Sequence, residues 1–150
     1  MSPDTLSVWV ALSVAAAAFL GVAVAFPTAP PPDAAAAAAT VDTVAAADYP
    51  ASATHPVAAD AARVGPRRIA LRNAGGRATA TLVYGPVVPV DDGGLARVLA
   101  GEHPGTVFES AAAFRRAASR ARNRTPVWRS VDSLDVRRVT WQGSDVTLVG

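Results

Sequence analysis

The sequence contains no cysteine and no lysine. The lack of cysteine excludes disulfide bonds, thiolate metal sites, a thiol nucleophile and a lipid attached through a cysteine at the membrane edge. All 14 basic residues are arginines, a bias that is expected of a GC-rich genome at least as much as of a selected chemistry. The formal net charge is only +2, so the overall charge does not require nucleic acid or an anionic surface as a partner.

Charged residues are also absent from the segment between Leu6 and Phe26. As a helix, this segment spans about 31 Å, which matches the hydrocarbon core of a bilayer. The small residues at 23–25 resemble a signal-peptidase site, so a cleaved signal peptide is the alternative. The apolar run is longer than the ~7–15 residues of a signal peptide, however, and Asp4 lies where a positive charge is expected. We therefore predict an uncleaved transmembrane anchor within residues 1–26.

Proline and alanine dominate residues 27–66, which we predict to be a linker or stalk. The prolines at its start favour a stiff, solvated polyproline spacer. Asp33 is a good N-cap for a helix over 34–47. Only Val41 and Val44 would give this helix an apolar face, so it suits an exposed stalk as well as a packed element.

Arginines next to the span do not decide its orientation, because the first arginine after Phe26 is Arg63. A stiff spacer suits an exported domain, and the short flank Met1–Thr5 is easily retained inside the cell. We expect a single-pass protein of the cell membrane with its domain on the extracellular side. Membrane lipid is then the partner of the N-terminal helix.

Residues 67–150 have the length and pattern of one small domain. Arginine and apolar residues alternate over 67–72, and apolar and polar residues alternate again over 77–84. The turn residues 73–76 lie between the two segments. This pattern predicts a β-hairpin with one buried face.

Two helices are predicted after the turn at 91–94. The first is short, over residues 95–100. The second begins at Thr106, since Thr106 and Glu109 have the spacing of a capping box. On a helical wheel its apolar residues share one face, opposite several arginines. These apolar residues are Val107, Ala111, Phe114, Ala118 and Ala121.

Strands are predicted at 127–128, 134–142 and 146–149, with a turn at 142–145. The order of hairpin, helices and hairpin favours an α+β fold. In this fold a small antiparallel sheet of about four strands packs against one or two helices.

No residue set with catalytic, cofactor-binding or metal-binding spacing is found, so we predict that the chain is not an enzyme. His55 and His103 are each followed by proline and lack further metal ligands at helical or strand spacing. The serines have neither a nucleophile-elbow context nor a recognisable histidine and acid partner. Asp91 and Asp92 precede two glycines but lack the other ligands of a calcium loop, which favours a solvated turn.

The densest basic patch consists of the arginines at 115, 116, 120, 122 and 124. Such a patch could contact phosphates or anionic lipid headgroups. No aromatic residues are interleaved to stack on bases, and cations near the end of a helix complement its dipole. We interpret the patch as a solvated helix face and expect no nucleic-acid partner.

Three segments of the chain resemble a family of uncharacterised membrane-anchored proteins from haloarchaea. The segments are FPTAPPPDAAAAAATVDTV, HPVAADAARVGPRRIALRNAGG and DVRRVTWQGSDVTLVG. The resemblance implies no catalytic residues, because the family has no established activity. It also implies an association with loci for pilus-like or secretion components. The nearly balanced numbers of acidic and basic residues depart from the acidic surfaces typical of haloarchaeal proteins.

Two functional hypotheses follow. The first is a non-enzymatic, membrane-anchored surface protein with a structural or assembly role and with protein partners, in a pilus-like or secretion apparatus. The alternative is a ligand-binding or sensory ectodomain. An apolar pocket with convergent polar groups would favour the ligand-binding hypothesis, and a flat apolar patch would favour the hypothesis of a protein partner. A domain facing inward, with the 115–124 patch on lipid or nucleic acid, is a third possibility.

Overall fold

The computed structural model of the chain describes Val10 and residues 29–150. The chain divides into two units, Met1–Pro30 and Pro31–Gly150. The predicted anchor, Leu6 to Phe26, lies outside the described residues except for Val10. Among the residues that the structure describes, no helix is both long enough and apolar enough to cross a membrane. The fold described below is that of the second unit.

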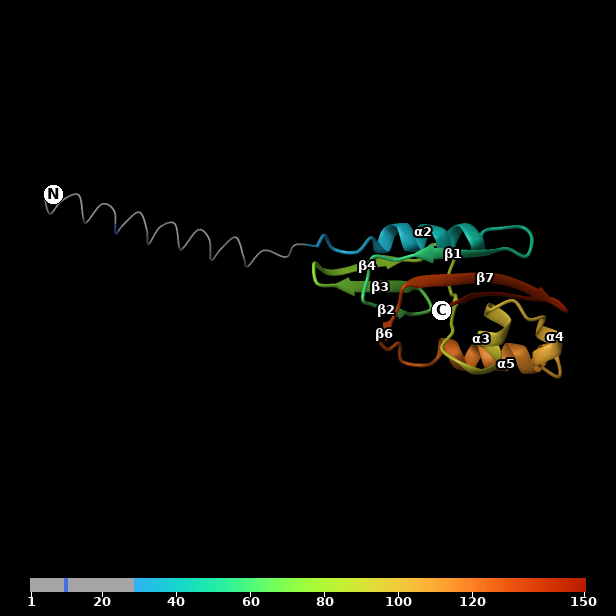
Figure 1. The fold of residues 1–150 in the computed structure, drawn as a ribbon. Coiled ribbons are helices and arrows are strands. Elements are labelled where there is room, and N and C mark those ends of the chain that lie inside the picture. The colour runs from blue at the N-terminus through green and yellow to red at the C-terminus, as the bar shows by residue number, and fades with distance from the viewer. Residues whose placement is uncertain (1–9, 11–28) are drawn as a thin grey trace, which may run out of the picture. The chain divides into compact units, whose positions relative to one another are not determined.

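The second unit contains two four-stranded sheets and four helices (Figure 1). The strand orders are β1-β7-β8-β5 and β4-β3-β2-β6. All neighbouring strands are antiparallel except β5 and β8, which are parallel. The predicted α+β class with a small antiparallel sheet is thus confirmed, and a second sheet is added. The elements are α2 (Ala34–Ala45), β1 (Ser52–Pro56), β2 (Ala61–Val64), β3 (Arg68–Asn73), β4 (Gly76–Thr81), β5 (Val88–Pro89), α3 (Gly93–Leu99), α4 (Pro104–Val107), α5 (Ala111–Arg122), β6 (Arg129–Ser130), β7 (Ser133–Trp141) and β8 (Ser144–Val149).

The predicted hairpin is present as β3 and β4, but β4 ends at Thr81 instead of residue 84, and the turn is shorter than residues 73–76. Arg68 lies opposite Thr81 and Asn73 lies opposite Gly76. The Asn73 Oδ1 atom accepts a hydrogen bond from the Gly75 N–H at 2.8 Å, and Gly76 has a φ of +135°, which favours glycine. Local turn chemistry therefore fixes the register that turns Ile69 and its partners inward.

The β7–β8 hairpin forms the centre of the first sheet. Its two-residue turn, Gln142 and Gly143, has positive φ angles of 46° and 74°. This is the type of tight turn that fits the twist of paired strands. Strand β8 begins at Ser144, so the observed turn is shorter than the predicted one.

Helix α2 corrects the predicted linker over 27–66. Asp33 caps the helix as predicted, accepting a hydrogen bond from the Ala36 N–H at 2.9 Å. One side of the helix is fully buried, with Ala37 and Val41 at 0% exposure. Its alanines are small enough to let the helix approach the sheets closely, so a thin apolar face is sufficient for packing. The compact unit therefore begins at residue 31 rather than 67.

Pairing in the sheets explains why the rest of the predicted linker is also ordered. Strand β1 pairs with β7, and β2 pairs with β3 and β6. β7 and β6 lie far along the chain from β1 and β2, whereas β3 follows β2 after a short turn. The prolines that suggested an irregular connection lie at or beyond the strand ends.

The second unit has two cores. The first contains Val41 of α2 together with Ile69 and Leu71 of β3. The second core lies between α3, α5 and the first sheet. The predicted apolar face of the main helix is buried at Ala111, Phe114, Ala118 and Ala121. The predicted capping box is wrong. The N-cap is Ser110, whose Oγ accepts a hydrogen bond from the Ala113 N–H at 3.2 Å, whereas Thr106 lies within α4.

Phe108 is the physical reason for this difference. Its backbone is extended, with φ −118° and ψ 139°, and separates α4 from α5. Its ring centre lies 5.4 Å from that of Phe114. Smaller differences occur elsewhere: α3 covers 93–99 instead of 95–100, and the strand predicted at 127–128 is instead β6 at 129–130.

Candidate functional site

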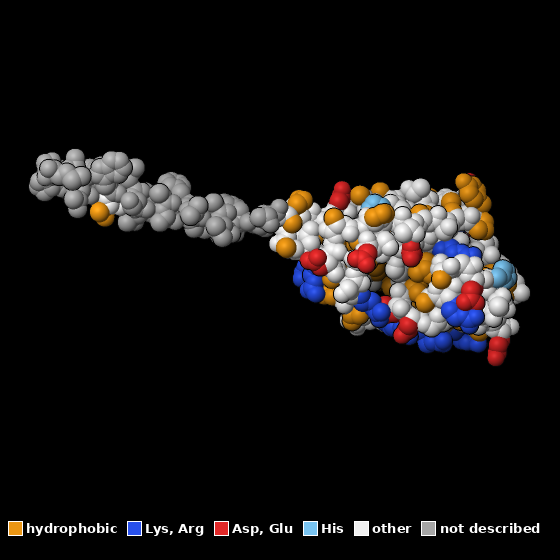
Figure 2. Space-filling view, in the orientation of Figure 1, with side chains coloured by type: hydrophobic (Ala, Val, Ile, Leu, Met, Phe, Trp, Pro, Cys, Tyr) orange, Lys and Arg blue, Asp and Glu red, His pale blue; other side chains and the backbone are white. Residues whose placement is uncertain are grey.

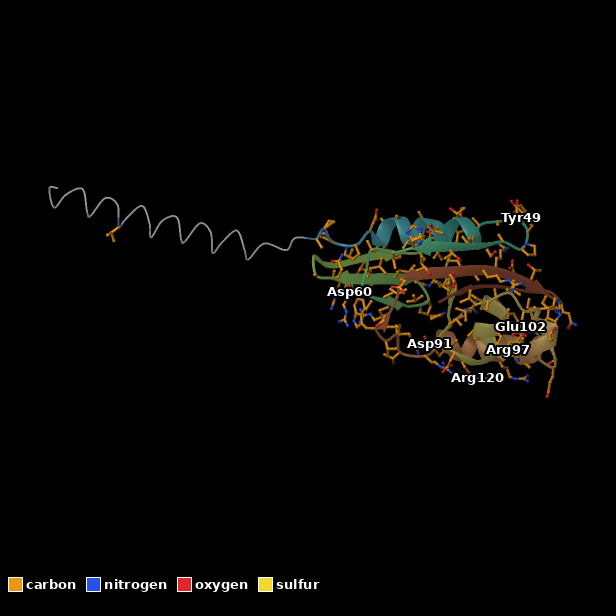
Figure 3. The ribbon with its side chains drawn as sticks, in the orientation of Figure 1. Tyr49, Asp60, Asp91, Arg97, Glu102 and Arg120 are labelled. Carbon is orange, nitrogen blue, oxygen red and sulfur yellow. The ribbon has the colours of Figure 1, made fainter. Side chains whose placement is uncertain are left out.

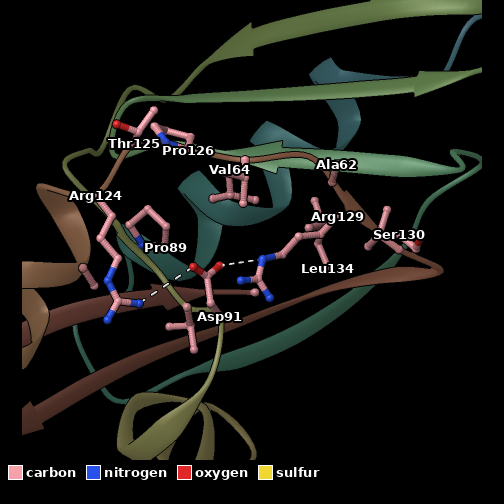
Figure 4. Close-up of a pocket in the computed structure, with 15 residues that line it drawn as sticks. Ala62, Val64, Pro89, Asp91, Arg124, Thr125, Pro126, Arg129, Ser130 and Leu134 are labelled. Carbon is pink, nitrogen blue, oxygen red and sulfur yellow. Dashed lines mark ion pairs between the residues drawn. The ribbon is translucent and has the colours of Figure 1, made fainter.

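A pocket of about 180 Å³ lies where β2 and β6 of the second sheet meet β5 and the segment that follows α5 (Figure 4). Most of the residues that line it are apolar, including Val64, Val90, Pro126 and Leu134, but polar groups contribute a comparable share of the surface. These side chains come from three separated parts of the chain. The pocket therefore exists only when both sheets are assembled.

Asp91 lies at this pocket between two arginines, as Figure 4 shows. The Arg129 Nε atom is 3.0 Å from the Asp91 Oδ1 atom, and the Arg124 Nη1 atom is 3.9 Å from Oδ2. Both arginine side chains are more than half exposed, so these ion pairs stabilise the fold only weakly. One carboxylate cannot neutralise two guanidinium groups, and the cluster retains one positive charge.

The positions of these three residues follow from neighbouring secondary structure. Val90, just before Asp91, donates its N–H to the Val149 carbonyl at 2.8 Å and so extends the pairing between β5 and β8. Arg129 lies in β6 opposite Ala62 of β2. Arg124 follows the last turn of α5.

The volume of the pocket limits what can bind there. Sites for small molecules usually measure about 300–1,000 Å³. A pocket of about 180 Å³ fits a single side chain or a very small acid, and the excess positive charge favours an anionic group. The arrangement can thus hold an apolar group with a carboxylate at its end.

A second, wider recess of about 640 Å³ lies between β1, β7 and the end of α3. Its one basic side chain, Arg137, donates hydrogen bonds to the carbonyl oxygens of Val98 and Glu102. The Thr54 hydroxyl donates to Asp135 at 2.6 Å. These groups are occupied in holding the fold, which leaves the smaller pocket as the better candidate site.

Residues 1–139 match a family of unknown function, DUF7283. The chain belongs to the DUF7283 family. No curated protein and no solved structure matches the chain. The matched region of this DUF7283 protein contains Asp91, Arg124 and Arg129, but it ends before β8.

The two histidines of the DUF7283 chain hold structural elements in place. His55 Nδ1 lies 2.9 Å from the Thr40 hydroxyl and links β1 to α2. His103 Nδ1 accepts the Gly105 N–H at 3.0 Å and caps α4. Among the residues that the structure describes, no three His, Cys, Asp or Glu side chains are grouped so that they could hold a metal ion.

The predicted basic patch at 115–124 is divided among several roles. Arg115 donates a hydrogen bond to the buried Ser144 hydroxyl at 3.0 Å. Arg122 is partly buried, and the loss of hydration lowers the pKa of its guanidinium group. Arg116 and Arg120 remain exposed on α5, whereas Arg124 contacts Asp91 at the pocket.

Asp91 and its two arginines were not predicted from the sequence as a site. The sequence pattern favours a solvated turn at Asp91 and Asp92. Asp92 is instead the N-cap of α3, although its side chain makes no capping hydrogen bond. The arginines lie 33 and 38 positions after Asp91, and no local spacing links such distant residues.

Proposed function

We propose that this DUF7283 chain is a non-enzymatic, single-pass surface protein with a structural or assembly role. In this proposal, Leu6 to Phe26 anchor the chain in the cell membrane and residues 31–150 lie outside the cell. The uncharged N-terminal segment supports the anchor. The resemblance to haloarchaeal proteins of pilus-like or secretion loci supports an archaeal source and a role in such an apparatus.

The small charged pocket is the main observation that supports the assembly role. It is too small for most metabolites, but it matches one side chain of a partner protein. An apolar recess with guanidinium groups at its edge is also the composition expected of an anchoring point in a protein interface. Partner proteins are therefore the favoured binding class.

Cross-linking from the pocket tests the partner hypothesis. Because the chain has no cysteine, a Ser130→Cys variant places one photoreactive maleimide label beside the pocket. In intact cells we expect a discrete adduct with a second protein, reduced by adding Arg129→Gln. The control is Val83→Cys, whose site is 78% exposed and outside the pocket. An equal adduct yield at both positions would contradict the assembly role.

Orientation is tested with the same control variant. If the domain lies outside the cell, a membrane-impermeant maleimide is expected to label Val83→Cys in intact cells, because the side chain at this position is exposed. Labelling that requires cell lysis would show that the domain faces the cytoplasm.

The apolar walls and convergent arginines also support the alternative, a ligand-binding ectodomain. The size of the pocket restricts such a ligand to a very small carboxylic acid. A ligand that binds only the folded state raises the melting temperature. Acetate and butyrate are therefore expected to stabilise the full-length protein but not its Arg129→Gln variant if this alternative is correct.

A further inference from the structure

Three arginines from three neighbouring strands surround the ring of Trp128. The guanidinium carbons of Arg63, Arg72 and Arg77 lie 5.1, 4.6 and 5.0 Å from the ring centre, distances typical of cation–π contacts. Arg72 and Arg77 are directly opposite each other in the β3–β4 register. Arg68 lies four residues before Arg72 in β3 and therefore on the same side of the sheet.

These four residues form what we call the arginine face, consisting of Arg63, Arg68, Arg72 and Arg77 around Trp128. It is the outer side of the second sheet, because Ile69 and Leu71 of the alternate positions lie in the core beneath α2. Figure 2 shows basic side chains over this sheet and along α5. Ala70 lies on this side of the sheet opposite Arg63 and is only 1% exposed, so the larger side chains of the face cover it.

No ion pair neutralises the arginine face among the described residues. Elsewhere, Arg97, Arg124, Arg129 and Arg138 all form ion pairs with acidic side chains. Asp60, which precedes β2, forms no ion pair with the face, although its N–H bonds to the Arg72 carbonyl. The face thus presents four positive charges with no acidic partner.

This arrangement does not increase the stability of the fold. Like charges at directly opposite positions of a sheet destabilise the pair, as for Arg72 and Arg77. Neutral residues of similar length would cover Ala70 without that repulsion. The indole reduces the repulsion only in part, but it holds three guanidinium groups in defined positions. Groups that are already ordered lose less entropy when they bind a partner.

We propose that the arginine face docks a carboxylate-rich segment of a partner protein. The choice of a protein rests on the proposed assembly role, while the charge of the segment follows from the face itself. Guanidinium groups bind carboxylates through paired, charge-assisted hydrogen bonds. Nucleic acid is disfavoured, because the π surface of Trp128 is already occupied by cations and the described strands β2, β3 and β4 contain no aromatic residue on which bases could stack.

Peptide binding by the full-length protein in neutral-detergent micelles tests the proposal. The probe is a fluorescently labelled octaglutamate peptide, followed by anisotropy at low and high salt. We expect saturable binding that weakens as salt rises. The double variant Arg72→Gln and Arg77→Gln is expected to weaken binding by about tenfold, the loss of two exposed ion pairs. The matched control, Arg116→Gln with Arg120→Gln, removes the same charge from α5 and is expected to change affinity less than about twofold.

A third variant distinguishes the effect of the net charge on binding from the effect of the positions of the guanidinium groups. Trp128→Leu keeps all four arginines but removes the ring that orders them, so it is expected to weaken peptide binding while net charge stays constant. Urea denaturation of each variant establishes that it is folded, and the glutamine variants retain most of each arginine stem. If Trp128→Leu is unfolded, Trp128→Phe, with its smaller ring and weaker cation–π contacts, replaces it and must also weaken binding.

Several results would overturn the proposal. These are no binding of octaglutamate, equal losses in the two double variants, or unchanged binding without the indole. Stronger binding of an eight-nucleotide thymidine oligomer or of inositol trisphosphate, lost in the Arg72 and Arg77 variant, would assign the face to nucleic acid or to a phosphorylated headgroup instead. These measurements do not depend on membrane orientation, so they can fail independently of the topology experiment.

Discussion

Replacing Val41 with alanine tests whether α2 is part of the folded unit. Val41 is 0% exposed and lies in the core cluster with Ile69 and Leu71. The substitution removes two buried methyl groups, worth about 0.8 kcal/mol each in transfer free energy. The cavity left behind adds to this loss, so we expect a destabilisation of about 2–3 kcal/mol.

Urea denaturation of the full-length protein in neutral detergent measures this change. For a small unit with a urea m value of about 1–3 kcal/mol per molar, the midpoint is expected to fall by roughly 1–3 M. Near-ultraviolet circular dichroism is a suitable signal, because the partly buried Trp141 packs against the second core, with its ring 6.1 Å from the Phe114 ring. A common transition in both near- and far-ultraviolet signals would show that the two cores unfold together.

Val83→Ala is the matched control, since the same two methyl groups are removed from a side chain that is 78% exposed. It is expected to change stability by less than about 0.5 kcal/mol. If Val41→Ala behaved like Val83→Ala, α2 would be a stalk, and our account of the first core would be wrong.

Three further predictions concern the second core and its surroundings. Phe114→Ala, at a side chain with 0% exposure, is expected to cost about 3–5 kcal/mol and to be detected as a large fall in melting temperature; a small fall would contradict the packing of α5. Ser110→Ala removes the N-cap of α5 and is expected to cost about 1 kcal/mol in urea denaturation, whereas Thr106→Ala, at the wrongly predicted cap, is expected to cost less. The hydrogen bonds from Arg97 lower the pKa of Glu102, so the contribution of this pair is present above the pKa of the unfolded carboxyl group and is lost as pH falls through the lower folded value. Stability should therefore decline less steeply in acid for Glu102→Gln than for the unmodified chain, and parallel curves would refute the assignment.

Elements with strong local signals could be predicted from the sequence. The β3–β4 hairpin follows from alternation and from the turn at Asn73, and α5 follows from the spacing of Phe114, Ala118 and Ala121. The N-cap at Asp33 was also predicted, because a cap depends only on the next few residues. These features arise from interactions within about ten residues of the chain.

Features that depend on distant residues could not be predicted in this way. Helix α2 was interpreted as a possible stalk, because its alanines show no strong apolar stripe, and only the two sheets reveal what they pack against. The same holds for Trp128, which was assigned to a short strand. Its role depends on arginines in three strands that the β2–β3–β4 register brings together. The ion pairs of Asp91 could not be predicted for the same reason, because Arg124 and Arg129 come close to it only when the sheets and α5 have formed.

The pairing of β1 with β7 has a consequence for protein synthesis. Thr54 and its partner Asp135 are 81 positions apart in the chain. At about 5–20 residues per second, the ribosome needs roughly 4–16 s to make the intervening segment. During that time α2 and β1 have emerged without the central strands β7 and β8 that cover them. A nascent chain of this protein therefore exposes apolar surface until β7 and β8 are made, and loss of β8 alone would remove the middle of a sheet rather than its edge.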